Sequence, residues 1–370
     1  MRRVIPLLLC AAAFVSSCAP TRVDKPKVLA PSVPVLVWSS RDLPARLHDQ
    51  LGGIQGVRSV TPMAVAVVNL TKVTGAPALP HRRVGGVLPM SIAAFDPPPG
   101  ATDAMSVALN AGEGVLTETS ATLRRMGEGG TVTVQGAGTG VRRTFRIGAI
   151  VSDAAGRGRE LIIPMRRSAG LGFTAPRALL VAVGEDRLDA AVAAMKSATT
   201  GLRTRIHVGA NPVINPDESP VLAFVELKTI FGEFTYKPRR GRLVTIDRAW
   251  VNRNIVQTNV PLMGLIKCNK ALLPQLTGAM LELKRLGLAS LIRSNSGCWS
   301  PRMQVGNTFD VSRHAFGIAV DLNAPQNPYG ETPHQDHRLI EVMERWGFVW
   351  GGRWLVPDGM HFEFVRFVKR

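Results

Sequence analysis

The sequence predicts an α+β domain at the C-terminus, with a small antiparallel sheet and flanking helices, preceded by a mixed α/β domain. Short apolar runs of strand length alternate with segments of helical periodicity along the whole chain. The breaker-rich residues 209–220 form a linker that divides the chain into residues 35–208 and 221–370. With 45% hydrophobic and 19% charged residues, the chain has the composition of a globular protein that buries a core.

The formal net charge of +18 is spread over the whole sequence. Arginine pairs recur, but there is no dense basic run, and only 6% of the residues are aromatic. A nucleic-acid binder usually concentrates its charge on one element and interleaves aromatic residues with it. We therefore expect no nucleic-acid partner. The charge is either a solvated basic surface or a surface attracted to an anionic cell envelope.

Residues 1–18 have the pattern of a secretory signal peptide. Arg2 and Arg3 precede an apolar stretch from Val4 to Val15, which is too short for a comfortable membrane span. The small residues that end at Cys18 are similar to a lipobox, in which the cysteine is lipidated and tethers the protein to the membrane. Simple cleavage or an uncleaved anchor is the alternative. We expect an exported protein at the outer face of the bacterial cytoplasmic membrane or in the periplasm.

Residues 19–34 contain four prolines and several charges, which indicates a tether between the membrane and the folded body. Beyond the signal, Cys268 and Cys298 are the two remaining cysteines. Such a pair in an exported protein is a candidate disulfide, with two buried thiols as the alternative.

Residues 35–208 alternate strand-like runs with helical segments. We expect strands at 35–38 and 63–70, a hairpin formed by 131–134 and 144–151, and helices at 42–51 and 188–195. The histidines of this region are isolated, and each is interpreted as structural or exposed: His48, His81 and His207. No metal spacing or nucleophile motif occurs here, so the sequence does not indicate what this domain does.

Two helices are expected in the C-terminal part. Residues 271–286 are amphipathic, and Pro274 can occupy the first turn of that helix. Residues 337–346 place Leu339, Ile340 and Met343 on one side.

Two alternating strands carry the candidate site. In residues 318–323, Asp321 points to the face opposite Ile318 and Val320, and in residues 358–364, His361 and Glu363 share one face. If the two strands pair, Asp321 and His361 face the same cleft, and the loop leading into the first strand delivers His314. An aspartate in such an apolar strand is costly unless it is paired or bound to a cation.

Two imidazoles and one carboxylate form a three-ligand zinc set that leaves a fourth position for water. Asp358 is placed to act as the base that hydrolysis requires, and Glu363 could instead hydrogen-bond a ligand histidine. The residues alone leave open a second interpretation, in which His314 and His361 are core histidines satisfied by neighbouring carboxylates.

The wider pattern closely resembles the D-alanyl-D-alanine carboxypeptidase family. Three motifs carry the resemblance: Ser312-x-His314-x-x-Gly317-x-Ala319-x-Asp321, Trp346-Gly-Phe-x-Trp350-Gly-Gly-x-Trp354, and Asp358-x-x-His361-Phe-Glu363. The family includes vancomycin-resistance carboxypeptidases and phage L-alanyl-D-glutamate endopeptidases, and it shares its fold with hedgehog signalling domains. The resemblance covers roughly residues 225–370. It implies that His314, Asp321 and His361 are zinc ligands and that Asp358 is the acidic catalytic base.

The resemblance also assigns roles to residues around this set. It implies that Arg302 binds a substrate carboxylate, with a surface salt bridge as the alternative, that Ser312 hydrogen-bonds near the metal, and that Cys268 and Cys298 form a disulfide. Trp350 and Trp354 are expected to wall the cleft. A competing cluster of His334, Asp336 and His337 is interpreted as a loop leading into a helix that Asp336 caps.

The predicted function is therefore zinc-dependent hydrolysis of peptidoglycan stem peptides. The alternative is a non-catalytic wall-binding or signalling module with a structural zinc, as in the hedgehog branch. A further alternative places the function in residues 35–208, as an envelope assembly factor. Within that region, residues 53–62 faintly resemble extracytoplasmic domains of bacterial permeases, although such phrases are also common at helix-to-strand turns.

Overall fold

The computed structural model describes residues 31–39, 41–75, 86–98, 100–173, 176–209, 221–305 and 307–369. The predicted signal peptide with Cys18, most of the tether, most of the linker and His81 lie outside these residues. Residues 32–370 form one unit by their internal contacts. Within the described part of the chain, no helix has the length and apolarity needed to cross a membrane.

One nine-stranded sheet organises residues 32–208, in the order β3-β7-β4-β6-β5-β2-β8-β1-β9. Its strands are β1 (Ser32–Ser39), β2 (Val57–Thr74), β3 (Leu88–Ala94), β4 (Gly114–Thr117), β5 (Thr131–Gly136), β6 (Arg142–Val151), β7 (Leu161–Ile163), β8 (Ala178–Gly184) and β9 (Thr204–Val208).

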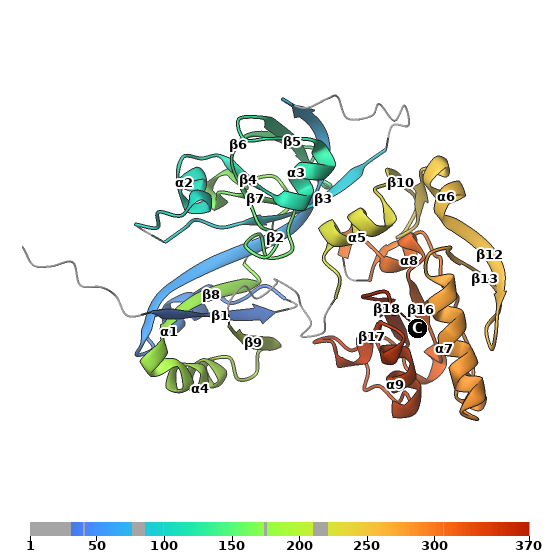
Figure 1. Cartoon of the computed structure of the whole chain (residues 1–370). Coiled ribbons are helices and arrows are strands. Elements are labelled where there is room, and N and C mark those ends of the chain that lie inside the picture. The colour runs from blue at the N-terminus through green and yellow to red at the C-terminus, as the bar shows by residue number, and fades with distance from the viewer. Residues whose placement is uncertain are drawn as a thin grey trace, which may run out of the picture. The chain divides into compact units, whose positions relative to one another are not determined.

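The 18-residue strand β2 gives this sheet its barrel-like form. Its first part pairs with β8, and its second part pairs with both β3 and β5. Because β3 is also the far end of the row of strands, its pairing with β2 closes six strands into a ring. Figure 1 shows β2 running from the open part of the sheet, beside β8, into this ring.

In the described part of this region, the α-helices that accompany the sheet are α1 (Ala45–Gly52), α2 (Ala104–Asn110), α3 (Glu118–Arg124) and α4 (Leu188–Ala198). The buried leucines and valines of β1 and β8 pack with Leu47, Leu51 and Met195 from α1 and α4. A separate core lies among the ring strands and includes Phe145 and Ile147.

The predicted elements of this region are confirmed; the strands and α4 are longer than expected, whereas α1 begins three residues later, at Ala45. The expected hairpin is β5 paired antiparallel with β6, and the expected helices are α1 and α4. The strand expected at 63–70 is the middle of β2. The expected mixed α/β domain has a barrel-like sheet, because β2 pairs with three partners, and such pairing leaves no local sequence signal.

The C-terminal part combines helices with small antiparallel sheets, as predicted. Its helices are α5 (Phe224–Phe231), α6 (Arg248–Asn254), α7 (Leu273–Arg285), α8 (Arg313–Phe316) and α9 (His337–Arg345). Three strand pairs are β10 (Tyr236–Pro238) with β11 (Val244–Ile246), β12 (Ile255–Val260) with β13 (Gly264–Asn269), and β14 (Met303–Gln304) with β15 (Asn307–Val311). A three-stranded sheet has the order β16 (Ala319–Asp321), β18 (His361–Phe364) and β17 (Phe348–Trp350).

Helices α7 and α9 form as the sequence predicts. Pro274 lies in the first turn of α7, and the side chain of Asp336 caps α9 by accepting a hydrogen bond from the Arg338 amide at 2.9 Å. Both helices bury one apolar face in the core that also contains Phe362 and Phe364 of β18. The site strands therefore rest on a packed support (Figure 1).

A buried ion cluster joins residues from both sides of the linker, and consists of Arg124, Glu160, Lys228 and Glu233. The Glu160 carboxylate accepts hydrogen bonds from Arg124 at 2.8 Å and from Lys228 at 2.9 Å, and Lys228 and Arg124 both contact Glu233. A β-bridge between Val87 and Tyr236 adds two backbone hydrogen bonds to this junction. The second half of α5 and the first residue of β10 are thereby held against the sheet.

Candidate active site

Strands β16 and β18 bring Asp321 and His361 together. The strands are antiparallel, and their register sets Asp321 directly opposite His361. Directly opposed residues project to the same face of a sheet, so the carboxylate and the imidazole converge. The sequence prediction that the two strands pair and share a face is confirmed.

His314 lies on the short helix α8, whereas a loop was expected. The Ser312 side chain caps this helix by accepting a hydrogen bond from the His314 amide at 3.3 Å. Gly317 ends it in the left-handed conformation with φ of 69°, and a Cβ there would lie 2.7 Å from the Asn269 amide nitrogen. The Ser and Gly of the motif therefore set the turn that delivers His314.

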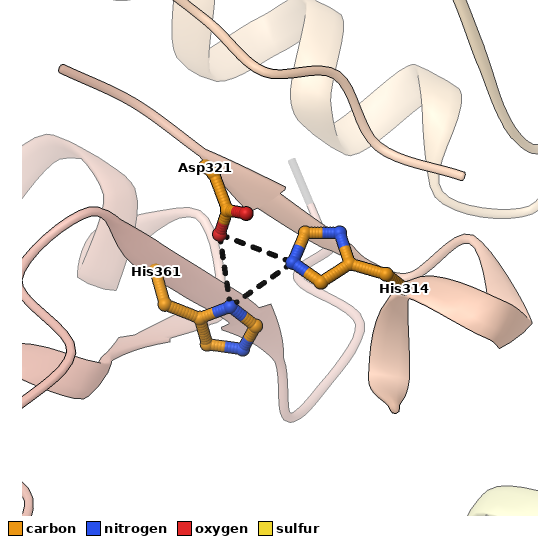
Figure 2. A group of neighbouring side chains, drawn as sticks. All are labelled: His314, Asp321 and His361. Carbon is orange, nitrogen blue, oxygen red and sulfur yellow. Dashed lines mark hydrogen bonds and ion pairs between the residues drawn. The ribbon is translucent and has the colours of Figure 1, made fainter. Parts of the chain in front are cut away.

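Three ligand atoms meet at the centre of the site (Figure 2). His314 Nε2 lies 3.0 Å from Asp321 Oδ1, His361 Nδ1 lies 3.1 Å from the same oxygen, and the two nitrogens are 3.2 Å apart. Donors around a tetrahedral zinc ion at about 2.0–2.1 Å are separated by about 3.3 Å. Among the described residues, this is the group of histidine, cysteine and carboxylate side chains whose donor atoms could hold a metal ion.

The outer nitrogens of both histidines are also engaged. His314 Nδ1 lies 2.9 Å from the Cys298 carbonyl oxygen, and His361 Nε2 lies 3.1 Å from Glu363 Oε2. When these nitrogens carry the protons and donate, the inner nitrogens present lone pairs to one another and to Asp321. This arrangement of outer partners is typical of zinc-binding histidines, and the residues fit a zinc ion.

The electrostatics of Asp321 and His361 reflect this crowding. Burial alone would raise the pKa of Asp321, but the hydrogen bonds and charges of the two histidines hold it well below its usual range. Burial lowers the pKa of His361, whereas the hydrogen bonds to Asp321 and Glu363 outweigh it and raise the pKa to about 10. Without a metal ion, a proton on His361 therefore interacts with the lone pairs that the neighbouring side chains direct toward it.

The disulfide between Cys268 and Cys298 is present, with a Cα–Cα distance of 5.2 Å. Both residues are buried in the core, and the Cys298 carbonyl is the oxygen that His314 contacts. The cross-link thus fixes a backbone segment that orients one histidine.

Asp358 lines the same pocket as His314 and His361, which has a volume of about 280 Å³. Its backbone is held by hydrogen bonds to Gly351 and His361, while its Oδ1 atom is buried without a hydrogen-bond partner among the described residues. Burial raises the pKa of the Asp358 carboxyl, with Asp321 adding to the effect and His361 opposing it. A carboxyl whose pKa is raised holds a transferred proton more readily than an ordinary aspartate does, which suits a general base.

Other residues named from the sequence surround this set. Arg302 lines the pocket and reaches Asp321 Oδ2 at 3.3 Å. Trp354 also lines the pocket, and its ring centroid lies 5.2 Å from that of His361. Trp350 is not among the residues that line the pocket; its side chain donates a hydrogen bond to the Gly359 carbonyl. Ser312 lines the pocket in addition to capping α8.

His334 and His337 lie apart from the metal-binding group. The His334 amide donates to the Asn327 side chain, and the side chain of His337 is 79% exposed. Asp336 caps the helix, as the sequence indicated.

Arg313 is a site residue that sequence reasoning missed. Its Nε atom lies 3.7 Å from Glu363 Oε1, its Nη2 atom donates to the Leu222 carbonyl at 2.6 Å, and its guanidinium lies over the ring of Phe224. Arg313 thereby connects the start of α5 to the carboxylate that contacts His361. It occupies a variable position of the motif, so the motif gave no signal for it.

The C-terminal segment is similar to a known family. Residues 306–364 match D-alanyl-D-alanine carboxypeptidase. The match covers all the candidate ligands and Asp358, confirms the resemblance predicted from the motifs, and supports a peptidase. No curated protein is similar enough to match the chain.

Two solved structures are similar to about half of the chain. The periplasmic region of MacB from Actinobacillus actinomycetemcomitans has 14% identity and a TM-score of 0.33, and covers 47% of this chain and 87% of its own. The extracellular domain of the noncanonic ABC-type transporter YknZ from Gram-positive bacteria has 12% identity and a TM-score of 0.30, and covers 48% of this chain and 98% of its own.

Proposed function

We propose that this chain is a zinc-dependent peptidase that hydrolyses an amide bond in peptidoglycan stem peptides. The observation that carries the proposal is the triangle of His314 Nε2, Asp321 Oδ1 and His361 Nδ1, with sides of 3.0–3.2 Å. In the same pocket lies Asp358 Oδ1, which has no hydrogen-bond partner within the described part of the chain. The family match over the same residues supports the reaction class.

His314, Asp321 and His361 would hold the zinc ion. A zinc ion bound there would polarise the scissile carbonyl and lower the pKa of a water molecule. The Cys298 carbonyl and Glu363 keep the two imidazoles in the orientation that presents the inner nitrogens.

Asp358 and Arg302 complete the proposed chemistry. The Asp358 carboxylate takes the proton of the attacking water and returns it to the leaving amine. The Arg302 guanidinium, 31% exposed in the pocket, binds a substrate carboxylate through its paired N–H groups. The aromatic ring of Trp354 excludes water from one side of the site.

We further propose that the protein is exported and anchored by a lipid on Cys18. The charged and apolar pattern of residues 1–18 supports this location. The net charge of +18 would favour anionic polymers of the cell wall.

The test is digestion of purified peptidoglycan by zinc-loaded protein, with and without a chelator, followed by mass spectrometry of the products. Loss of one alanine identifies a carboxypeptidase, and cleavage between L-Ala and D-Glu identifies an endopeptidase. Absence of any product from the metal-replete protein refutes hydrolysis and leaves the wall-binding module with a structural zinc.

A further inference from the structure

Two regions of the chain contribute to the pocket of the candidate active site. Gly158 and Arg159, in the connection between β6 and β7 of the sheet region, belong to its lining together with residues of the C-terminal part. The family match begins only at residue 306, so the sheet region lies outside the matched segment. Contacts between the sheet region and the site are therefore features that the family match does not describe.

A short turn of the C-terminal part carries one wall of this pocket. The turn spans Gly351–Arg353, and residues 354–358 after it contribute to the pocket lining, among them Trp354 and Asp358. The Gly351 carbonyl accepts hydrogen bonds from the Trp354 amide at 3.0 Å and from the Asp358 amide at 2.9 Å. The position of the turn therefore sets the position of the candidate base.

The sheet region contacts this turn through Arg205. Arg205 lies on β9, an edge strand of the nine-stranded sheet. Its Nη2 atom donates a hydrogen bond at 2.6 Å to the carbonyl of Arg353, the last residue of the turn. A hydrogen bond from a charged donor is stronger than one between neutral groups. The guanidinium of Arg205 is therefore placed to restrain the turn.

A second contact places the same loop on the same face of the sheet. Arg205 is paired directly with Trp38 of β1, and directly opposed residues project to one face. Trp38 belongs to a buried core cluster with Leu36 and Met63, and Leu355 packs against this cluster. Helices α1 and α4 pack against the other face of β1. The loop after the turn therefore lies on the face that these helices do not cover.

The C-terminal part restrains the turn through contacts of its own. The Arg353 guanidinium pairs with Glu344 of α9 and lies over the ring of Trp350, 5.6 Å from its centroid. The side chains of this ion pair are 52% and 31% exposed, and exposed ion pairs contribute little to stability. We therefore expect the hydrogen bond from Arg205 to be a main restraint on this end of the loop.

We propose that Arg205 is a positioning residue of the peptidase, through which the sheet region holds Asp358 in the geometry that hydrolysis requires. This inference rests on the proposed function. Arg205 is not among the residues that line the pocket, so it acts through the turn and does not touch the substrate. A displacement of about 1 Å in a catalytic group can lower a rate about 100-fold. Restraint of the turn is therefore sufficient to affect catalysis.

The first test measures the restraint of the turn without relying on hydrolysis. Amide hydrogen exchange of the full-length, zinc-loaded protein is followed by mass spectrometry of the segment that contains the Trp354 and Asp358 amides. Arg205→Met is expected to speed exchange of this segment about 10-fold, because the hydrogen bond to the turn is lost. Arg205→Lys keeps a charged donor and should restore part of the protection. Arg203→Met removes an exposed arginine near the start of β9 and should exchange as the wild type does.

The second test measures hydrolysis of a synthetic stem pentapeptide by the same proteins. Arg205→Met should lower kcat at least about 10-fold, with little change in KM and unchanged zinc content. A residue that only stabilised the fold would leave kcat of the folded protein unchanged. In an Asp358→Asn background, Arg205→Met should change the residual kcat less than about twofold, because the group whose position matters is absent.

Unchanged exchange in Arg205→Met would overturn the proposal, and so would a loss of kcat that is as large in the Asp358→Asn background as in the wild type. An equal loss of kcat in Arg203→Met would also overturn it, since that variant keeps the contact with the turn. If the wild type hydrolyses no peptide, the proposed function fails. The exchange comparison then still decides whether Arg205 holds the turn.

Discussion

The buried ion cluster and the triad of His314, Asp321 and His361 use similar side chains in opposite ways. In the ion cluster, cations and anions alternate, because Glu160 contacts Arg124 and Lys228 and both of these contact Glu233. In the triad, three electron-pair donors converge within 3.2 Å of one another. A buried cluster that contains its own counterions needs no further ion and is damaged when one partner is removed, whereas a cluster that gathers electron-pair donors is suited to bind a cation.

The largest effect is expected from removing a triad residue. Asp321→Ala should abolish stoichiometric zinc binding and lower hydrolysis by at least about three orders of magnitude, because the charge stabilisation from the metal is worth several kcal/mol. Metal content by atomic spectroscopy and the peptide assay check this. His337→Ala changes an exposed histidine outside the triad and should retain both properties. Full zinc content in Asp321→Ala would contradict the assignment.

A substitution of Asp358 is expected to impair proton transfer without impairing metal binding. Asp358→Asn should lower kcat about 10²- to 10⁴-fold while the protein keeps its zinc, since the proposed role of Asp358 is to take the proton of the attacking water and not to bind the metal. Single-turnover kinetics together with metal analysis measure the two properties. Unchanged kcat would assign the proton transfer to another group.

A substitution in the ion cluster is expected to lower the stability of the fold. Lys228→Met leaves Glu160 and Glu233 with one cation fewer and should cost about 3–5 kcal/mol in the free energy of unfolding. Urea unfolding followed by tryptophan fluorescence measures this, with the exposed Lys237→Met as the matched control. A loss equal to that of the control would show that the cluster contributes nothing to the fold.

Glu363 belongs to the site but acts through His361. Glu363→Gln should weaken zinc affinity about 10- to 100-fold, the range typical of partners of ligand histidines. Competition with a chromophoric chelator gives the affinity, and Glu341→Gln on the exposed side of α9 serves as the control. Equal affinities in the two variants would exclude an orienting role for Glu363.

The smallest effect is expected on the stability of the fold at acidic pH. Burial alone would raise the pKa of Glu233, but Lys228 and Arg124 outweigh it and place the pKa below its ordinary value of 4.5. The stabilisation from Glu233 is therefore complete above about pH 4.5 and is lost as the pH falls through the lower folded-state pKa. Unfolding midpoints between pH 6 and 3 should fall less steeply in Lys228→Met than in the wild type. Parallel curves would contradict this linkage.

Much of the candidate site could be predicted because its information is local. Period-two alternation placed Asp321 and His361 on one face, and the Ser312 cap and Gly317 of the motif define the turn that presents His314. The helices α7 and α9 followed from apolar periodicity, Pro274 and the Asp336 cap. Each of these signals acts within a few residues along the chain.

The remaining features depend on pairs of residues far apart in sequence. No periodic pattern in the sequence indicates these features. They are the ring closed by β2 and β3, the contact of Arg313 with Glu363, and the position of Arg159 at the pocket. The sequence by itself therefore predicted the candidate ligand set and the candidate base, and it determined the main helices and strands. The tertiary structure decided which charges are neutralised within the protein and which face the pocket, because both depend on contacts that form only when distant segments pack together.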